Sequence, residues 1–205
     1  MLYELAHTIQ SYLPFVWNLI EDMNSFLFVV RYGKKLKVVP NILNSFSTSF
    51  SLCVAENSDA PDLAEFFSRQ PVSAYEYFKP HNFDRKTIEE LVRRKSYLFF
   101  LVKDEEKIVG YYFLRCFFMG KSYLGKIVDV DYRGKGIGKL MCLSAMEVAT
   151  SMGLHMYETI SKNNIASLYS TQKVLDTKIL KEMPGNYIYI EDLPKAKNMK
   201  YENDN

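Results

Sequence analysis

One stretch decides the fold: Ile127-Val-Asp-Val-Asp-Tyr-Arg-Gly-Lys-Gly-Ile-Gly-Lys-Leu140. An apolar strand leads into three alternating glycines, Gly134, Gly136 and Gly138, and apolar residues then recur at helical spacing. Glycine tolerates a positive φ and has no side chain to block a ligand, and the N-terminus of a helix favours negative charge. The stretch therefore predicts a backbone cradle for a pyrophosphate group.

The spacing of the glycines distinguishes this motif from two common phosphate-binding loops. A P-loop requires a glycine where Arg133 stands and a Ser or Thr where Leu140 stands. A dinucleotide fingerprint requires Gly-x-Gly-x-x-Gly, whereas this chain has Gly-x-Gly-x-Gly. The pattern Arg-x-x-Gly-x-Gly is met by Arg133, Gly136 and Gly138. With this motif the sequence resembles the GNAT superfamily of acyl-CoA-dependent N-acyltransferases.

The resemblance implies an α/β fold with a mixed, mostly antiparallel central sheet and flanking helices, in which the fourth and fifth strands splay apart. It also implies that acetyl-CoA is the co-substrate and that the amide of Val128 polarises the acetyl carbonyl while an amine attacks it directly. The implied cofactor-binding residues are Lys126, Ile127, Val128, Arg133, Gly134, Lys135, Gly136, Ile137, Gly138, Lys139 and Asn164. The same motif could also be a glycine turn without a ligand.

The order of the remaining elements agrees with this fold. Period-two alternation over residues 46–54 predicts the first strand, and helices are expected from Pro61 and after Asp84. Strands are expected at 97–103, 107–118, 123–130 and 155–160, helices from 137 to Gly153 and from 164 to 173, and a closing hairpin at 178–191. The acetyltransferase domain is therefore predicted at residues 46–194, followed by a polar tail at 195–205.

The first 45 residues lie outside the resemblance. Apolar residues recur at three- and four-residue spacing from Leu2 to Leu27, with Pro14 as a predicted break, which indicates an amphipathic helical appendage. Residues 31–37 are predicted to form a basic hinge and residues 40–45 a linker. Glu21 and Asp22 argue against a membrane-spanning helix. A cap on the core or a homodimer contact is favoured over a membrane-surface or partner-docking helix.

Composition narrows the class of protein. The net charge is +2 in 205 residues, and Lys and Arg form no long block, so nucleic acid is not expected as a partner. Cys53, Cys116 and Cys142 each lie in an apolar segment, which favours reduced buried thiols over a disulfide. The three histidines share no metal-ligand spacing with them. We therefore expect a cytoplasmic protein without a metal site.

The catalytic residues are less clearly indicated. The resemblance implies a Tyr seven residues after the Asn that opens the last helix, but Thr171 occupies this position relative to Asn164. Tyr169 lies two residues earlier, which turns it about 200° away on a helix. Both Tyr169 and Glu158, a base acting through water, are weak candidates, and Glu158 could equally point outward.

The acceptor is suggested by an aromatic segment between the first two predicted strands. Tyr77, Phe78 and His81 are the candidate substrate-binding residues, because aromatic faces stack on sugar rings. The segment resembles one in GNAT members of nucleotide-amino-sugar pathways, although an ordinary loop core would look the same. The predicted function is acetyl transfer to a small-molecule amine such as an amino sugar. A protein or peptide N-acetyltransferase and a non-catalytic CoA-binding module are the alternatives.

Overall fold

The computed structural model describes residues 14–195. They form one seven-stranded sheet in the order β1-β2-β3-β4-β5-β7-β6, in which β4 and β5 are parallel and every other neighbouring pair is antiparallel. The strands are β1 Ser51–Val54, β2 Tyr97–Asp104, β3 Lys107–Phe117, β4 Lys121–Val128, β5 His155–Ser161, β6 Leu175–Met183 and β7 Tyr187–Pro194. This is the mixed, mostly antiparallel sheet that the sequence predicted.

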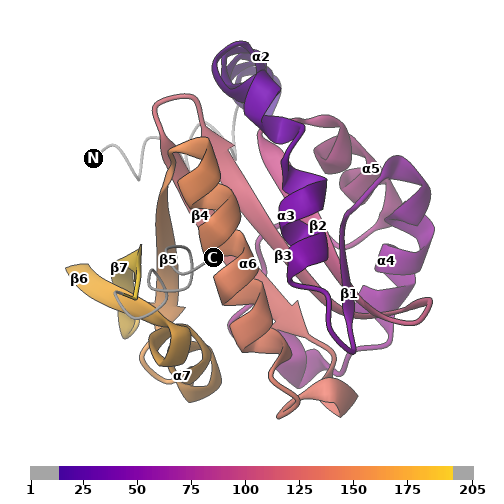
Figure 1. Ribbon diagram of the computed structural model, residues 1–205, viewed down its shortest axis with the longest axis vertical. Helices are drawn as coiled ribbons and strands as arrows, with labels where there is room; N and C mark the ends of the chain where they lie inside the picture. Colours follow the sequence, from indigo (N-terminus) through magenta and orange to yellow (C-terminus); the bar gives the residue numbers. More distant parts are fainter. Residues whose placement is uncertain (1–13, 196–205) are drawn as a thin grey trace, which may run out of the picture.

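The helices pack on both faces of the sheet (Figure 1). They are α2 Pro14–Leu36, α3 Val39–Ser45, α4 Ala60–Ser68, α5 Arg85–Arg93, α6 Ile137–Met152 and α7 Ile165–Val174, with short 3₁₀ turns η1 Asn57–Asp59, η2 Val72–Tyr75 and η3 Val130–Tyr132. Helices α2, α3 and α6 cover one face together with α7, and α4 and α5 cover the other.

Strand β3 shows why the sheet is buried on both sides. Tyr112 and Leu114 pack in the core under α6, whereas Tyr111 and Phe113 pack in the core under α4 and α5, and all four are buried. Successive side chains of a strand point to opposite faces, so a strand covered on both faces must be apolar throughout. Strand β3 therefore separates the two cores, and each side chain of the sheet belongs to one core or the other according to the face on which it lies.

The structure corrects three predictions near the N-terminus. Residues 40–45 form most of α3 rather than a linker, because Pro40 fits the first turn of a helix and Val39 and Leu43 bury one side of it. The predicted basic hinge lies largely inside α2, which continues to Leu36. The first strand begins only at Ser51, since the amide of Thr48 donates to the carbonyl of Phe50 and closes a turn.

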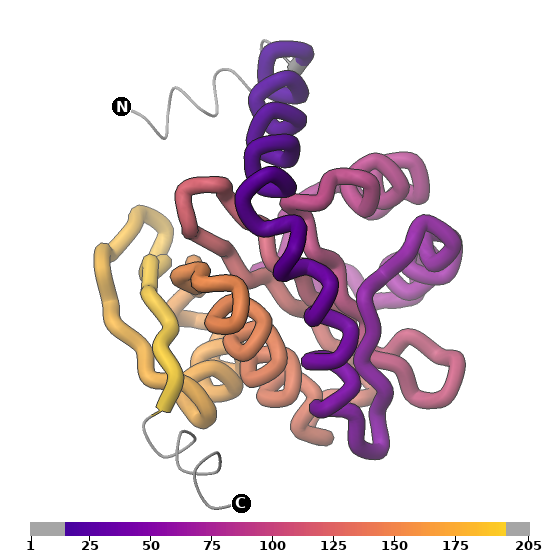
Figure 2. The backbone as a smooth tube through the Cα atoms, turned by 45° about the horizontal axis from the view of Figure 1, so that its top comes forward, coloured from indigo at the N-terminus to yellow at the C-terminus, as the bar shows by residue number. Residues whose placement is uncertain are grey.

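Helix α2 belongs partly to the core. Phe28 and Tyr32 are buried in the same cluster as α6, and the lower part of α2 lies along the body while its first turns project beyond it (Figure 2). Helix α2 begins at Pro14, and the part of the appendage before it lies outside the described residues. Among residues 14–195, no helix combines the length and the apolar character needed to cross a membrane.

Candidate active site

The glycine motif forms the turn between η3 and α6. Gly134 and Gly136 have φ angles of +80° and +85°, in the left-handed region that favours glycine, and a Cβ built on either would meet no protein atom within 4 Å. Gly138 has a different reason to be glycine, because a Cβ there would lie 3.2 Å from Cβ of Ser170 on α7. Two glycines therefore shape an open backbone turn, and the third allows α6 and α7 to pack closely.

The buried carboxylate of Asp129, directly before η3, holds the chain that leads into the glycine turn. Asp129 accepts hydrogen bonds from the amide of Asp131 at 3.0 Å and from the guanidinium of Arg69 at 3.1 Å. Although burial alone would raise the pKa of Asp129, these donors lower it below its usual value. An ionised Asp129 therefore anchors η3, from which the chain enters the glycine turn.

The cradle is lined by donors and cations. Gly136 caps the N-terminus of α6, where the first helical amides have no acceptor within their own helix. Lys135 lies over the ring of Tyr132 at 4.1 Å, and Lys139 over the ring of Tyr169 at 5.4 Å. Free amides, a helix N-terminus and two ammonium groups together form a site suited to a phosphate anion.

Strands β4 and β5 separate beside this cradle. They pair only from Lys121 to Tyr123, so the second half of β4 has no partner on that side. The amide of Asp129 donates to Val109 on β3, and the ladder alternates, so the amides of Lys126 and Val128 face the opening. A cleft of about 620 Å³ joins this opening to the glycine turn and to Tyr77, Phe78 and Asn164. The cofactor-binding residues named from the sequence all line this cleft except Lys135, which lies over the ring of Tyr132 at its edge.

A buried ionic cluster lies beneath the opening. Lys126 Nζ donates to Glu158 Oε2 at 2.6 Å and to Thr171 Oγ1 at 3.0 Å, and Thr171 Oγ1 donates to Glu158 Oε1 at 3.0 Å. The side chains of Lys126 and Glu158 are only 7% and 4% exposed. Glu158 alternates with Met156 and Ile160, which pack on the α6 and α7 side of the sheet, and it lines the same cleft as Tyr77 and Phe78.

Asp192 on β7 adds a second carboxyl group to this cluster. Burial raises its pKa to about 9, with a further contribution from the nearby charge of Glu158. Asp192 is therefore protonated at neutral pH, which leaves one cation and one anion, Lys126 and Glu158, in balance. Burial alone would lower the pKa of Lys126, but the charge and hydrogen bond of Glu158 help to raise it above its usual value, so Lys126 stays charged.

On α7, Tyr169 and Thr171, which occupies the position where the resemblance implies a Tyr, lie in different surroundings. Asn164 caps α7 by accepting from the amide of Ser167 at 3.1 Å, and Tyr169 lies at the surface, 58% exposed, beside Lys139. Thr171, seven residues after Asn164, is fully buried and joins the ionic cluster. The sequence analysis gave Thr171 no role, although its spacing from Asn164 was the signal that could have identified it.

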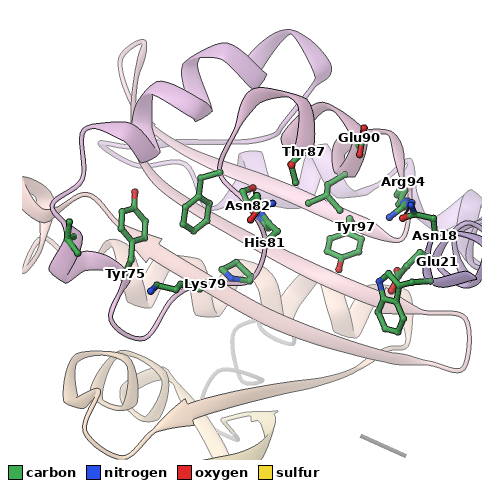
Figure 3. A pocket seen from close by; sticks show the side chains of 15 residues that line it. Asn18, Glu21, Tyr75, Lys79, His81, Asn82, Thr87, Glu90, Arg94 and Tyr97 are labelled. Carbon is green, nitrogen blue, oxygen red and sulfur yellow. Dashed lines mark hydrogen bonds between the residues drawn. The ribbon is translucent and has the colours of Figure 1, made fainter. Parts of the chain in front are cut away.

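His81 does not join Tyr77 and Phe78 in the cleft. It lines a second cavity of about 710 Å³ on the other side of the same segment, between α5 and α2 (Figure 3). His81 Nδ1 donates to the carbonyl of Asn82 at 2.7 Å, and Nε2 accepts from the hydroxyl of Tyr111 at 3.0 Å. Burial lowers the pKa of His81, so it is a neutral structural side chain. Its role in acceptor binding therefore stays a prediction.

Three tyrosines that the sequence analysis did not single out lie on the same face as Phe78. Tyr157 and Tyr189 stack with ring centroids 5.5 Å apart, and Tyr189 also stacks on Tyr123 at 6.2 Å. The hydroxyl groups of Tyr123 and Tyr189 lie 3.3 Å apart. Because these residues come from three different strands, only the pairing of β4, β5 and β7 brings them together.

This chain is similar to one family of protein sequences and to several solved structures. The sequence model of the Acetyltransferase (GNAT) family matches residues 60–173, over half of the 205 residues. No curated protein sequence matches the chain. Within residues 14–195, no group of three or more His, Cys, Asp or Glu side chains could hold a metal ion.

Three solved structures share the fold at low sequence identity. YncA from Salmonella typhimurium, with its cofactor acetyl-CoA, is 16% identical with a TM-score of 0.52, covering 71% of this chain and 92% of its own. The ribosomal-protein α-N-acetyltransferase RimL, in complex with coenzyme A, is 14% identical with a TM-score of 0.61, covering 73% and 96%. A spermidine N-acetyltransferase SpeG chimera from Vibrio cholerae is 16% identical with a TM-score of 0.55, covering 75% and 99%.

These structures share the fold, and the names of two of them give different acceptors, a ribosomal protein and spermidine, so the acceptor of this chain stays open. The family match spans α4 to α7 and contains the glycine turn, the opening between β4 and β5, and the capped last helix. The chain belongs to the GNAT family of acetyltransferases, enzymes that take the acetyl group from acetyl-CoA.

Proposed function

We propose that this acetyltransferase acts on the primary amine of a small, ring-containing molecule, with amino sugars and nucleotide-linked amino sugars as the favoured class. The observation that carries the proposal is the aromatic character of the face opposite the cofactor cradle. Tyr77 and Phe78 line the cleft there, and the stack of Tyr123, Tyr157 and Tyr189 continues the same face. Flat aromatic faces bearing hydroxyl groups suit a ring that is apolar on one side and polar at its edge.

The chain's own residues fit coenzyme A as the donor. Gly134 and Gly136 leave open space in front of their backbone, and the N-terminus of α6 with Lys135 and Lys139 offers positive charge to the pyrophosphate. Arg133, Ile137 and Gly138 complete this loop, and Asn164 lines the cleft from α7. The strand segment 126–128 would hold the pantetheine arm through its unpaired backbone groups.

The chemistry at the opening needs few side chains. Acetyl-CoA supplies an activated acetyl group when bound. The amide of Val128 faces the opening and is proposed to donate to the carbonyl oxygen of the thioester, where negative charge develops during amine attack. Direct attack by the acceptor amine requires no nucleophile from the protein. The proton lost by the amine passes to solvent in the open cleft.

Glu158 and Tyr169, the two weak catalytic candidates, lie in different surroundings. Glu158 as a base acting through water stays a prediction, and to serve it would have to give up its contact with Lys126 on the cofactor side. Tyr169 beside Lys139 lies near the phosphate cradle, so we propose a binding contact rather than an acid role. Protonation of the departing thiolate is therefore assigned to solvent.

A panel of amines tests the acceptor, with release of free CoA thiol as the signal. It should contain amino sugars, nucleotide-linked amino sugars, a polyamine and a peptide with a free N-terminus. Tyr77→Ala is expected to raise KM for the amine with little change in KM for acetyl-CoA. The matched control is Phe118→Ala, since Phe118 has nearly the same exposure, 37% against 36%, and does not line the cleft. Turnover of the peptide alone would show that the acceptor class is wrong.

We also propose that the protein works in the cytoplasm. Cys53, Cys116 and Cys142 are all free, and Cys116 and Cys142 are buried. Burial raises the pKa of Cys142 to about 11, so its thiol is neutral and unreactive. Unpaired thiols are usual in a reducing compartment, which supports this location.

A further inference from the structure

Helix α2 has two faces with opposite surroundings. Toward the domain, Glu21, Asn24 and Phe28 are buried. Glu21 pairs with Arg115, and the Asn24 side chain donates to the carbonyl of Cys116 at 2.9 Å. Toward solvent, eight large apolar side chains between Phe15 and Val30 are 37–80% exposed. A monomeric protein rarely leaves an apolar patch of this extent uncovered.

The outer face has the spacing of a coiled-coil seam. Its five central residues are separated by three, four, three and four positions, the alternation of a and d sites in a heptad repeat. These residues are Val16, Leu19, Met23, Phe26 and Val30. In the same register Glu21 and Phe28 occupy f sites, on the far side of the helix from the seam, and both are buried against the domain. In the sequence the same spacing extends upstream through Leu2, Leu5, Ile9 and Tyr12.

The charges on α2 favour a protein helix over a lipid surface. Between residues 14 and 30 the only charged residues are Glu21 and Asp22, both acidic. Helices that lie on membranes carry Lys and Arg along the polar face, and an acidic segment is repelled by anionic lipids. Asp22 is already paired with Arg94 at 3.0 Å, and Glu21 with Arg115. The seam itself therefore offers no charge that would repel an identical helix.

We propose that the outer face of α2 pairs with the same face of a second copy of this chain to form a two-fold symmetric dimer. A seam without charge is self-complementary, which is what an isologous interface requires. Met23 lies at the middle of the five seam positions and would meet its own counterpart across the two-fold axis, whichever direction the helices run. The first turns of α2 project beyond the body of the domain, so a second helix can lie along them (Figure 2).

The test compares two methionines with similar exposure in different places. Met23 on the seam is 55% exposed, and Met119 in the turn between β3 and β4 is 74% exposed. Molar mass by light scattering at micromolar concentration should give about twice 23.9 kDa for the parent chain and for Met119→Lys. Met23→Lys should give 23.9 kDa, because two lysines would face each other in an apolar seam and weaken the dimer at least about 100-fold. Unchanged acetyl-CoA binding would show that Met23→Lys is folded.

Four results would overturn the proposal. The parent chain could be a monomer at every concentration, or Met23→Lys could remain a dimer. Met119→Lys could dissociate as Met23→Lys does, which would place the effect outside the seam. Co-sedimentation of the parent chain with phosphatidylcholine vesicles, lost in Met23→Lys, would assign the face to a membrane instead.

Discussion

Removal of Lys126 should strongly destabilise the folded protein, because it leaves a carboxylate in the interior without its cation. Lys126 Nζ lies 2.6 Å from Glu158, and this pair is the most deeply buried ion pair within residues 14–195. In Lys126→Met the volume is kept, but Glu158 loses the cation that pairs with it and keeps only neutral partners such as the hydroxyl of Thr171. Desolvation of Glu158 is then no longer offset.

Breaking a buried pair from one side costs about 3–5 kcal/mol. For a chain of this size, each kcal/mol corresponds to about 2–4 °C in Tm, so the expected fall is roughly 6–20 °C. The double variant Lys126→Met/Glu158→Met removes both charges and should lie much closer to the parent, because the desolvation cost disappears with them. The difference between single and double variants is therefore the signature of the mechanism.

Thermal and denaturant unfolding followed by circular dichroism measure both quantities. The matched control is Lys162→Met, because Lys162 and Glu182 form a pair of similar length, 2.8 Å, whose side chains are 39% and 74% exposed. An exposed pair contributes about 0–1 kcal/mol, so this control should shift Tm little. A loss below about 1 kcal/mol in Lys126→Met, or a double variant less stable than either single one, would refute the reasoning.

Three further predictions follow from the same geometry. Because the pKa of Asp192 is raised to about 9 in the folded chain from its ordinary 3.8, folding binds a proton between these values, and stability should fall as pH rises through this range. Urea unfolding from pH 5 to pH 9 should show a shallower decline in Asp192→Asn, and equal slopes would contradict the assignment. Tyr169→Phe should lower kcat less than about tenfold, below the contribution of a well-placed general acid, and a hundredfold loss with KM preserved would identify Tyr169 as the acid. Deletion of residues 1–44 should lower the Tm and the solubility, because it removes Phe28, Tyr32, Val39 and Leu43 from the main core, and an unchanged Tm would show that this segment does not support the domain.

The fold was predictable where local signals and global packing agree. The glycine turn, the cap of Asp84 on α5 and the stop at Gly153 each have a backbone reason that is visible in the sequence. Helix α3 was missed because seven residues with a proline look like a linker. Only contact of Val39 and Leu43 with the core stabilises this helix.

The backbone part of the site could be predicted from the sequence, but the contacts between its side chains could not. Residues 126–128 and 133–139 are contiguous, so a motif could place them together. The Lys126–Glu158–Thr171 cluster joins β4, β5 and α7 through side chains, and no local pattern in the sequence shows which of these point inward. The sequence also could not show that His81 lies apart from Tyr77 and Phe78, since neighbouring residues on one loop face two different cavities.

Binding of acetyl-CoA to matched glycine variants tests the central claim most directly. Gly136 and Gly153 flank the two ends of α6 with φ angles of +85° and +73°, so a valine at either position meets similar backbone strain, on the order of 1–2 kcal/mol. Only Gly136 borders the cleft. A side chain there would occupy the space that the pyrophosphate needs, whereas one at Gly153 would not.

Isothermal titration calorimetry with acetyl-CoA supplies the measurement. We expect one acetyl-CoA per chain for the parent, the same affinity in Gly153→Val, and at least about tenfold weaker binding, or about 1.4 kcal/mol, in Gly136→Val. Parent-like binding by Gly136→Val, or an equal loss in both variants, would contradict a pyrophosphate cradle at the N-terminus of α6.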